Sequence, residues 1–112
     1  MAVIAKVLAE GVMAPAANAA LYQAPNATRT IIDKLTACNT SAAVATISVH
    51  LLPPAGAAAA ANIVVQAKAL QPGETYTCPE VVGHVLAPGG VINIIAGTAA
   101  VITVRASGRE VT

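Results

Sequence analysis

The chain has 112 residues, of which 56% are hydrophobic and 10% charged, and its net charge is +1. This is the length of one domain, and the scattered charges exclude the basic stripe of a nucleic-acid-binding protein and an acidic tail. With no Phe, no Trp and two Tyr, the core must be built from Ile, Val, Leu and Ala, and we expect another subunit to cover part of the surface.

The high hydropathy does not predict a membrane span. The longest uncharged stretch, between Lys34 and Lys68, contains several polar residues and a Pro-Pro pair, which do not fit a spanning helix. Near the N-terminus, Glu10 and Gly11 interrupt the apolar run before it reaches the length of a secretory signal. We therefore expect a soluble protein made in the cytoplasm, with neither membrane nor nucleic acid as a partner.

The N-terminal region is less regular than the rest of the chain. Residues Val3 to Glu10 fit either a strand or a turn of helix, and Ala14 to Ala20 have the composition of a linker. We therefore divide the chain into an N-terminal strand or arm over residues 1–19 and a β-sandwich domain over residues 20–112. The arm either packs on its own domain or reaches a partner.

Alternation of apolar and polar residues is the clearest signal along the chain. It runs through Ala45 to Leu51, Ile63 to Ala69 and Ile102 to Ala106, and each run places its apolar residues on one face of a strand. Residues Thr28 to Asn39 are rich in β-branched types, with Ile31 and Ile32 adjacent, which predicts a bulge or burial on both faces.

Shorter strands and regular turns complete the pattern. Strands are expected over Glu74 to Cys78 and Val91 to Ala96, a flexible connection or one helical turn over Ala57 to Ala61, and a turn at Ser107 and Gly108. Pro and Gly supply the backbone angles of turns between these runs. The predicted fold is all-β: a single antiparallel β-sandwich or jelly-roll-like domain.

The residues able to do chemistry form no recognisable constellation. Cys38 and Cys78 could pair with His50 and His84 as nucleophile and base or as zinc ligands, but their spacing matches no known pattern. We expect two reduced structural thiols, with a disulfide as the alternative, and His50 exposed on the polar side of its strand. The sequence thus predicts no catalytic, cofactor-binding or metal-binding residue, and no enzyme.

The order of motifs resembles small β-sandwich structural proteins of tailed bacteriophages. The similar features span residues 20–112: Leu21 to Pro25, Thr30 to Leu35, Cys38 to Ser41, Val44 to Gly56, Leu70 to Tyr76 and Val101 to Gly108. The resemblance implies a virion component and brings no catalytic residue. The Ala-rich loops of this chain depart from the pattern, which leaves the partner contacts open.

The expected function is that of a virion structural protein that decorates or cements a phage capsid. Its partners would be further copies of itself in a homo-oligomer, the major capsid protein or another virion protein. One alternative is a collar, tail or baseplate protein. Another is a carbohydrate-binding module. Such modules stack sugar rings on exposed aromatic side chains, and this chain has two tyrosines as its only aromatic residues.

Overall fold

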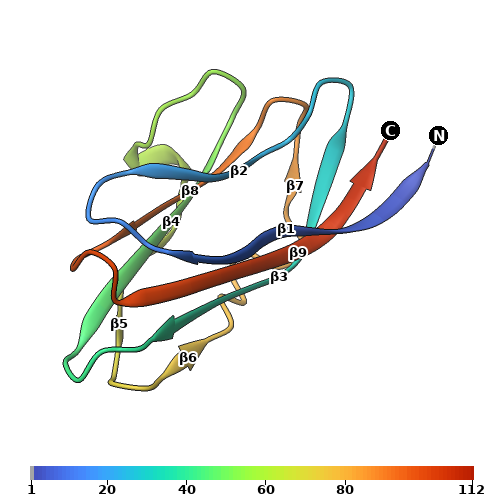
Figure 1. Ribbon diagram of the computed structural model, residues 1–112. Helices are drawn as coiled ribbons and strands as arrows, with labels where there is room; N and C mark the ends of the chain where they lie inside the picture. Colours follow the sequence, from blue (N-terminus) through green and yellow to red (C-terminus); the bar gives the residue numbers. More distant parts are fainter. Residues whose placement is uncertain (1) are drawn as a thin grey trace.

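The computed structural model describes residues 2–112, which form two antiparallel sheets packed face to face (Figure 1). This confirms the predicted all-β sandwich. Sheet A has the order β1–β9–β3–β6, with β7 also paired to β3, and sheet B has the order β2–β8–β4–β5. The strands of sheet A are β1 (Val3–Met13), β3 (Arg29–Asn39), β6 (Thr75–Tyr76), β7 (Val85–Leu86) and β9 (Ile102–Val111). Those of sheet B are β2 (Ala19–Gln23), β4 (Ala45–Leu52), β5 (Ile63–Leu70) and β8 (Val91–Ala96).

The core lies between the sheets and contains no aromatic ring that is fully buried. Its largest fully buried apolar side chains come from both sheets and from the turn between β6 and β7, which supplies Val81. Those from the strands are Ile32, Leu35, Ile47, Val49, Leu70, Ile92, Ile94, Ile102 and Val104. Small buried residues such as Ala37, Ala45 and Ala106 fill positions between them. Apolar residues at alternate positions of each strand therefore produce a dry layer between the sheets, as their period of two predicts.

The adjacent isoleucines of β3 lie on opposite faces of sheet A, and a bulge follows them. The pairing of β3 with β9 shifts between Ile32 and Lys34, which leaves Asp33 as the extra residue. Ile32 is fully buried, whereas Ile31 is half-buried and pairs with Val85 of β7. A bulge is therefore present, but it follows the two isoleucines and does not bring both of them to one face.

A second bulge reverses the phase of β5. Gln66 and Ala67 lie opposite Ser48 of β4, whose Oγ accepts a hydrogen bond of 2.8 Å from the Ala67 amide. Because one extra residue moves the following side chains to the other face, Leu70 is buried while Ala67 and Ala69 are exposed. The expectation that both alanines face inward was wrong.

Two local predictions also need correction, and a third agrees with the structure in one of its two alternatives. The expected linker over 14–20 already contains the start of β2, which pairs with β8. Ser107 and Gly108 lie inside β9 rather than in a turn, because β9 continues to Val111. The alanine tract leads into a single turn of 3-10 helix, η1 (Ala60–Asn62). No helix among residues 2–112 is long and apolar enough to cross a membrane.

Strand β1 forms one edge of sheet A. It pairs with β9 but the register shifts twice, so that Leu8 and Gly11 are bulged residues. Leu8 and Ala9 are nevertheless part of the core. At the far end of the same ladder Ala2 and Thr112 exchange backbone hydrogen bonds of 3.3 and 2.9 Å, so the two ends of the described chain lie side by side (Figure 1).

Candidate assembly surface

The four residues considered for nucleophilic or metal chemistry lie on separate segments. Cys38 is half-buried on β3, Cys78 is buried in the turn after β6, His50 is on β4, and His84 is exposed before β7. Both cysteines are free thiols, as expected, and no disulfide joins them. Within residues 2–112 no group of three or more His, Cys, Asp or Glu side chains is placed to hold a metal ion.

His50 is buried, which corrects the expectation that it is exposed. It is 8% exposed, and its Nδ1 atom has no hydrogen-bond partner among the described residues. The reason is its position: β4 is a central strand, with Asn93 of β8 on one side of His50 and Ile63 of β5 on the other, and η1 packs against β4. A polar residue on the outer side of a central strand can be buried between the side chains of its two neighbouring strands.

The thiols should differ in reactivity. Burial, followed by the nearby Glu80 carboxylate, raises the pKa of Cys78 to about 12, so almost none of it is thiolate at neutral pH. We expect a disulfide reagent such as dithionitrobenzoate to label Cys38 first in the native protein, and both thiols in denaturant without reductant. Equal labelling rates in the native state would contradict the buried position of Cys78.

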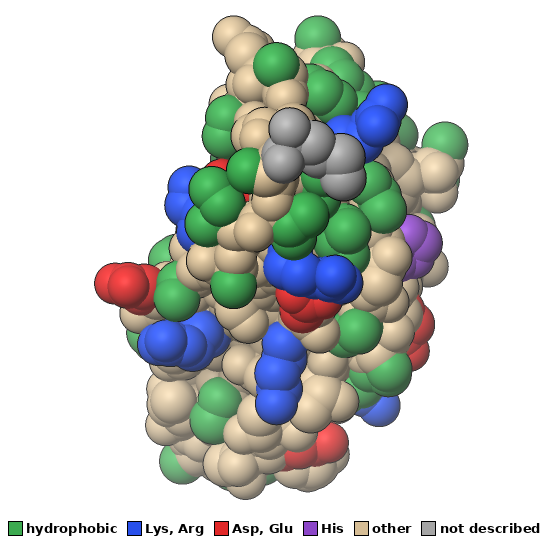
Figure 2. All heavy atoms as spheres, turned by 90° about the vertical axis from the view of Figure 1, so that its right-hand side faces the viewer, with side chains coloured by type: hydrophobic (Ala, Val, Ile, Leu, Met, Phe, Trp, Pro, Cys, Tyr) green, Lys and Arg blue, Asp and Glu red, His purple; other side chains and the backbone are tan. Residues whose placement is uncertain are grey.

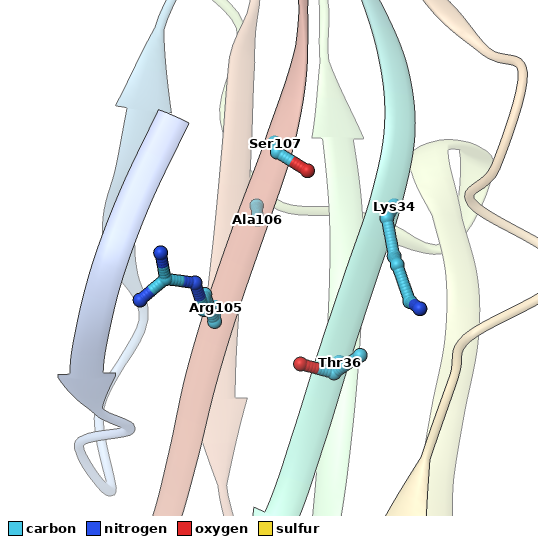
Figure 3. Close-up of a pocket in the computed structure, with 5 residues that line it drawn as sticks. All are labelled: Lys34, Thr36, Arg105, Ala106 and Ser107. Atoms are coloured by element: carbon cyan, nitrogen blue, oxygen red, sulfur yellow. The ribbon is translucent and has the colours of Figure 1, made fainter. Parts of the chain in front are cut away.

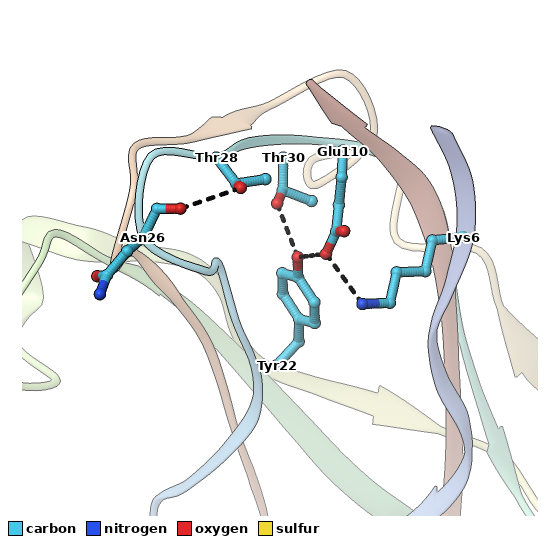
Figure 4. A network of polar contacts seen from close by, with 6 residues as sticks. All are labelled: Lys6, Tyr22, Asn26, Thr28, Thr30 and Glu110. Carbon is cyan, nitrogen blue, oxygen red and sulfur yellow. Dashed lines mark hydrogen bonds and ion pairs between the residues drawn. The ribbon is translucent and has the colours of Figure 1, made fainter. Parts of the chain in front are cut away.

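A cluster of polar side chains closes one open side of the sandwich (Figure 4). The Tyr22 hydroxyl of β2 donates to Glu110 of β9 at 2.5 Å and lies 2.8 Å from the Thr30 hydroxyl of β3. Lys6 of β1 forms an ion pair of 3.2 Å with the same Glu110 carboxylate. The cluster thereby joins three strands of sheet A to the edge strand β2 of sheet B.

A second cluster of the same composition closes the opposite side. Lys68 of β5 lies over the Tyr76 ring of β6, 5.2 Å from its centroid, within the range of a cation–π contact. The Tyr76 hydroxyl donates a short hydrogen bond to Glu80. Both tyrosines of the chain are therefore used in Lys–Tyr–Glu clusters that connect the two sheets at their edges.

Both lysines belong to the inward-facing side of an edge strand. Lys6 pairs with Gly108, whose other neighbour is the buried Ile32, and Lys68 pairs with the buried Ile47. The clusters therefore link the edge strands of the two sheets, and they supply no reactive group.

The Tyr22 cluster should make stability depend on pH. The hydrogen bond from Tyr22, and then Lys6, hold the pKa of Glu110 below its usual value against the effect of burial. A lowered pKa stabilises the fold above the unfolded value of about 4.3, and this contribution is lost as the pH falls through the lowered pKa. Tyr22→Phe should therefore lower the urea midpoint at pH 7, and by less at pH 3. The control is Tyr22→Phe in a Glu110→Gln background. There the effect of Tyr22→Phe on the urea midpoint should be the same at pH 7 and at pH 3.

Charge is distributed unevenly between the sheets. The strands of sheet B carry one charged residue in the described chain, Lys68, whereas eight lie on β1, β3 and β9: Lys6, Glu10, Arg29, Asp33, Lys34, Arg105, Arg109 and Glu110. On the outer face of sheet A, Arg109 holds Asp33 with two hydrogen bonds of 3.0 Å and one of 3.2 Å. Almost all charged residues of the strands therefore lie on sheet A, and the strands of sheet B carry almost none.

The depressions on sheet A are shallow. One is lined by Lys34, Thr36, Arg105 and Ser107, and Figure 3 shows the Arg105 side chain extending toward β1 while Lys34 extends away from it. Thr36 and Ser107 lie between them on neighbouring strands. The basic groups diverge rather than converge, so this surface does not form an enclosed site for a small molecule.

Exposed apolar side chains are concentrated on β1. Among residues 2–112, eight large hydrophobic side chains are exposed, and five of them, Val3, Ile4, Val7, Val12 and Met13, lie on this one strand. Figure 2 shows the end of the molecule that carries the chain termini, where hydrophobic side chains gather with Lys, Arg, Asp and Glu nearby. We call the open edge of β1 with these five side chains the β1 edge. The sequence made the apolar residues 3–13 a candidate partner-facing arm, with packing on their own domain as the equal alternative.

The comparisons with known proteins concern the fold. No protein-family model and no curated protein match the sequence. The crystal structure of the T13 particle of infectious bursal disease virus is similar over 97% of this chain, with 10% identity and a TM-score of 0.51. The VP2 subviral particle and the Gx strain of that virus are 13% and 14% identical, with TM-scores of 0.47 and 0.48. This chain spans about 30% of the length of those viral chains. The first of these likenesses shows a β-sandwich of the same kind, and it shows the fold alone.

Proposed function

We propose that the chain is a non-enzymatic structural protein of a virus particle, which works by packing against other subunits. The observation that carries the proposal is the β1 edge, because an edge strand that is open on one side and has five exposed apolar side chains is a surface that other chains can cover. A β-sandwich of similar shape occurs in the particle of infectious bursal disease virus, which supports a place in a particle wall.

The finer proposal is a tailed-phage virion protein that decorates or cements the capsid. It rests on the motif order of residues 20–112 and on the small size of the domain. Its partners would be further copies, the major capsid protein or another virion protein. Neither a cofactor nor nucleic acid is part of the proposal.

The carbohydrate-binding alternative is disfavoured by the use of the two tyrosines. Sugar rings stack on exposed aromatic faces, but Tyr22 is half-buried with its hydroxyl bound to Glu110, and Tyr76 has Lys68 over its ring. If a sugar stacked on either ring, the tyrosine would have to give up the contacts through which its cluster joins the two sheets.

Particle composition tests the proposal directly. Phage particles released by the source host should be purified on a density gradient and analysed by mass spectrometry, and we expect this chain at a fixed number of copies for each particle. Immunogold labelling should then place it on the head rather than on the collar, tail or baseplate. Absence from intact particles would overturn the structural role, and labelling of the tail alone would replace capsid decoration by the tail alternative.

A further inference from the structure

We propose that two copies of this chain pair through their β1 edges, antiparallel and about a two-fold axis at Val7, so that the two A sheets become one continuous sheet. The inference rests on the proposed function only in naming a subunit as the partner. Strand addition at an open edge satisfies the free backbone groups of both strands, and an antiparallel pair of identical strands is the closed, symmetric form of this contact.

The register follows from the ladder that β1 already makes with β9. Nine residues of β1 take part in it, because the two register shifts leave out Leu8 and Gly11. Val7 is the fifth of the nine, so a two-fold axis there places the first residue opposite the last. The resulting pairs are Val3 with Met13, Ile4 with Val12, Ala5 with Glu10, Lys6 with Ala9, and Val7 with Val7 of the second copy.

This register is self-complementary in its side chains. The five exposed apolar residues of the β1 edge meet one another and no other residue type. Each charged residue, Lys6 or Glu10, meets an alanine, so no like charges lie directly opposite, an arrangement that would be destabilising.

The register is also consistent with the two faces of sheet A. Val3, Val7 and Met13 pair with Val111, Ser107 and Thr103 and so belong to the outer row, whereas Ile4 and Val12 pair with Glu110 and Val104 in the inward row. Each proposed pair therefore joins residues of one row. Apolar contacts would form on both sides of the joined strands, which a single exposed face could not provide.

Substitution at the centre of the pair gives the sharpest test. Val7→Lys places two lysines directly opposite across the axis, and we expect the dissociation constant measured by analytical ultracentrifugation to rise about tenfold, since the repulsion of the opposed like charges adds to the loss of the central apolar pair. Val85→Lys is the matched control, because Val85 is also an exposed valine on sheet A, on β7 away from the β1 edge. It should leave the association unchanged.

A charge exchange tests the register itself. Val3→Lys alone and Met13→Glu alone should each weaken the dimer, whereas both substitutions in one chain should restore it, because each new lysine then meets a new glutamate of the second copy. Circular dichroism of every variant should retain the strand spectrum. A wild-type chain that stays monomeric at several hundred micromolar, equal effects of Val7→Lys and Val85→Lys, or no recovery in the double variant would overturn the pairing.

These outcomes are separate from those that test the proposed function. A chain found in purified particles but monomeric in solution and insensitive to Val7→Lys would remove the pairing and leave the structural role. A dimer with the expected register that is absent from particles would remove the structural role and leave the pairing.

Discussion

Replacing Gly108 by alanine should destabilise the fold by about 3 kcal/mol, at the upper end of the cost of inserting atoms into a packed site. A Cβ atom at Gly108 would lie 2.2 Å from the carbonyl oxygen of Ile31 and 3.1 Å from Leu8 Cδ1. The oxygen belongs to the neighbouring strand β3 and cannot move without opening the ladder with β9. Urea denaturation followed by circular dichroism measures the loss.

Gly73→Ala is the matched control for this substitution. Gly73 has a φ of +77° and nothing within 4 Å of a new Cβ, so its replacement introduces backbone strain of about 1 kcal/mol without a clash. Equal losses of stability for the two variants would show that the strands of sheet A move apart to accept a Cβ atom at Gly108. The close approach of Gly108 to Ile31 would then not constrain the residue at this position.

Asn39→Leu should cost about 2–4 kcal/mol, because it leaves buried backbone groups without a partner. Asn39 is fully buried at the end of β3. Its Nδ2 donates to the Ala43 and Leu70 carbonyls at 2.8 and 3.0 Å, and its Oδ1 accepts from the Ser41 amide at 3.0 Å and hydroxyl at 2.8 Å. One side chain therefore holds the β3–β4 turn against the end of β5.

Asn62→Leu provides the comparison. Asn62 also bonds two backbone groups, the Ala59 amide and the Ala57 carbonyl, but both bonds are exposed to solvent. Because water replaces lost partners at the surface, we expect a loss below about 1 kcal/mol. A loss at Asn62 as large as that at Asn39 would contradict the role given to burial.

The sequence predicted those parts of the fold that depend on neighbouring residues. The alternation in β4 follows from the side-chain period of two, and β3 follows from its run of β-branched residues. The phase of β5 did not follow, because the bulge at Ala67 depends on a hydroxyl of Ser48, which lies on another strand. The burial of His50 likewise depends on its two flanking strands rather than on its own strand.

The candidate surface was predicted in part. The apolar character of residues 3–13 made them a candidate partner-facing segment, with packing on their own domain as the equal alternative. Their place as the open edge of sheet A depends on pairing with β9 at the other end of the chain. The Lys–Tyr–Glu clusters gave no sequence signal at all. Tyr22 and Glu110 are 88 residues apart, and nothing in a single sequence relates them.

The neighbouring ends of β1 and β9 determine how the domain would respond to mechanical force. Ala2 and Thr112 lie at the same end of one antiparallel ladder, whose hydrogen bonds run across the strands. Tension applied between these two residues would load one hydrogen bond at a time, so that β1 separates from β9 by sequential breaking of the ladder from this end. Force applied across other parts of the sandwich would instead shear many bonds together. The fold should therefore be weak when pulled by its ends and resistant when pulled through its loops.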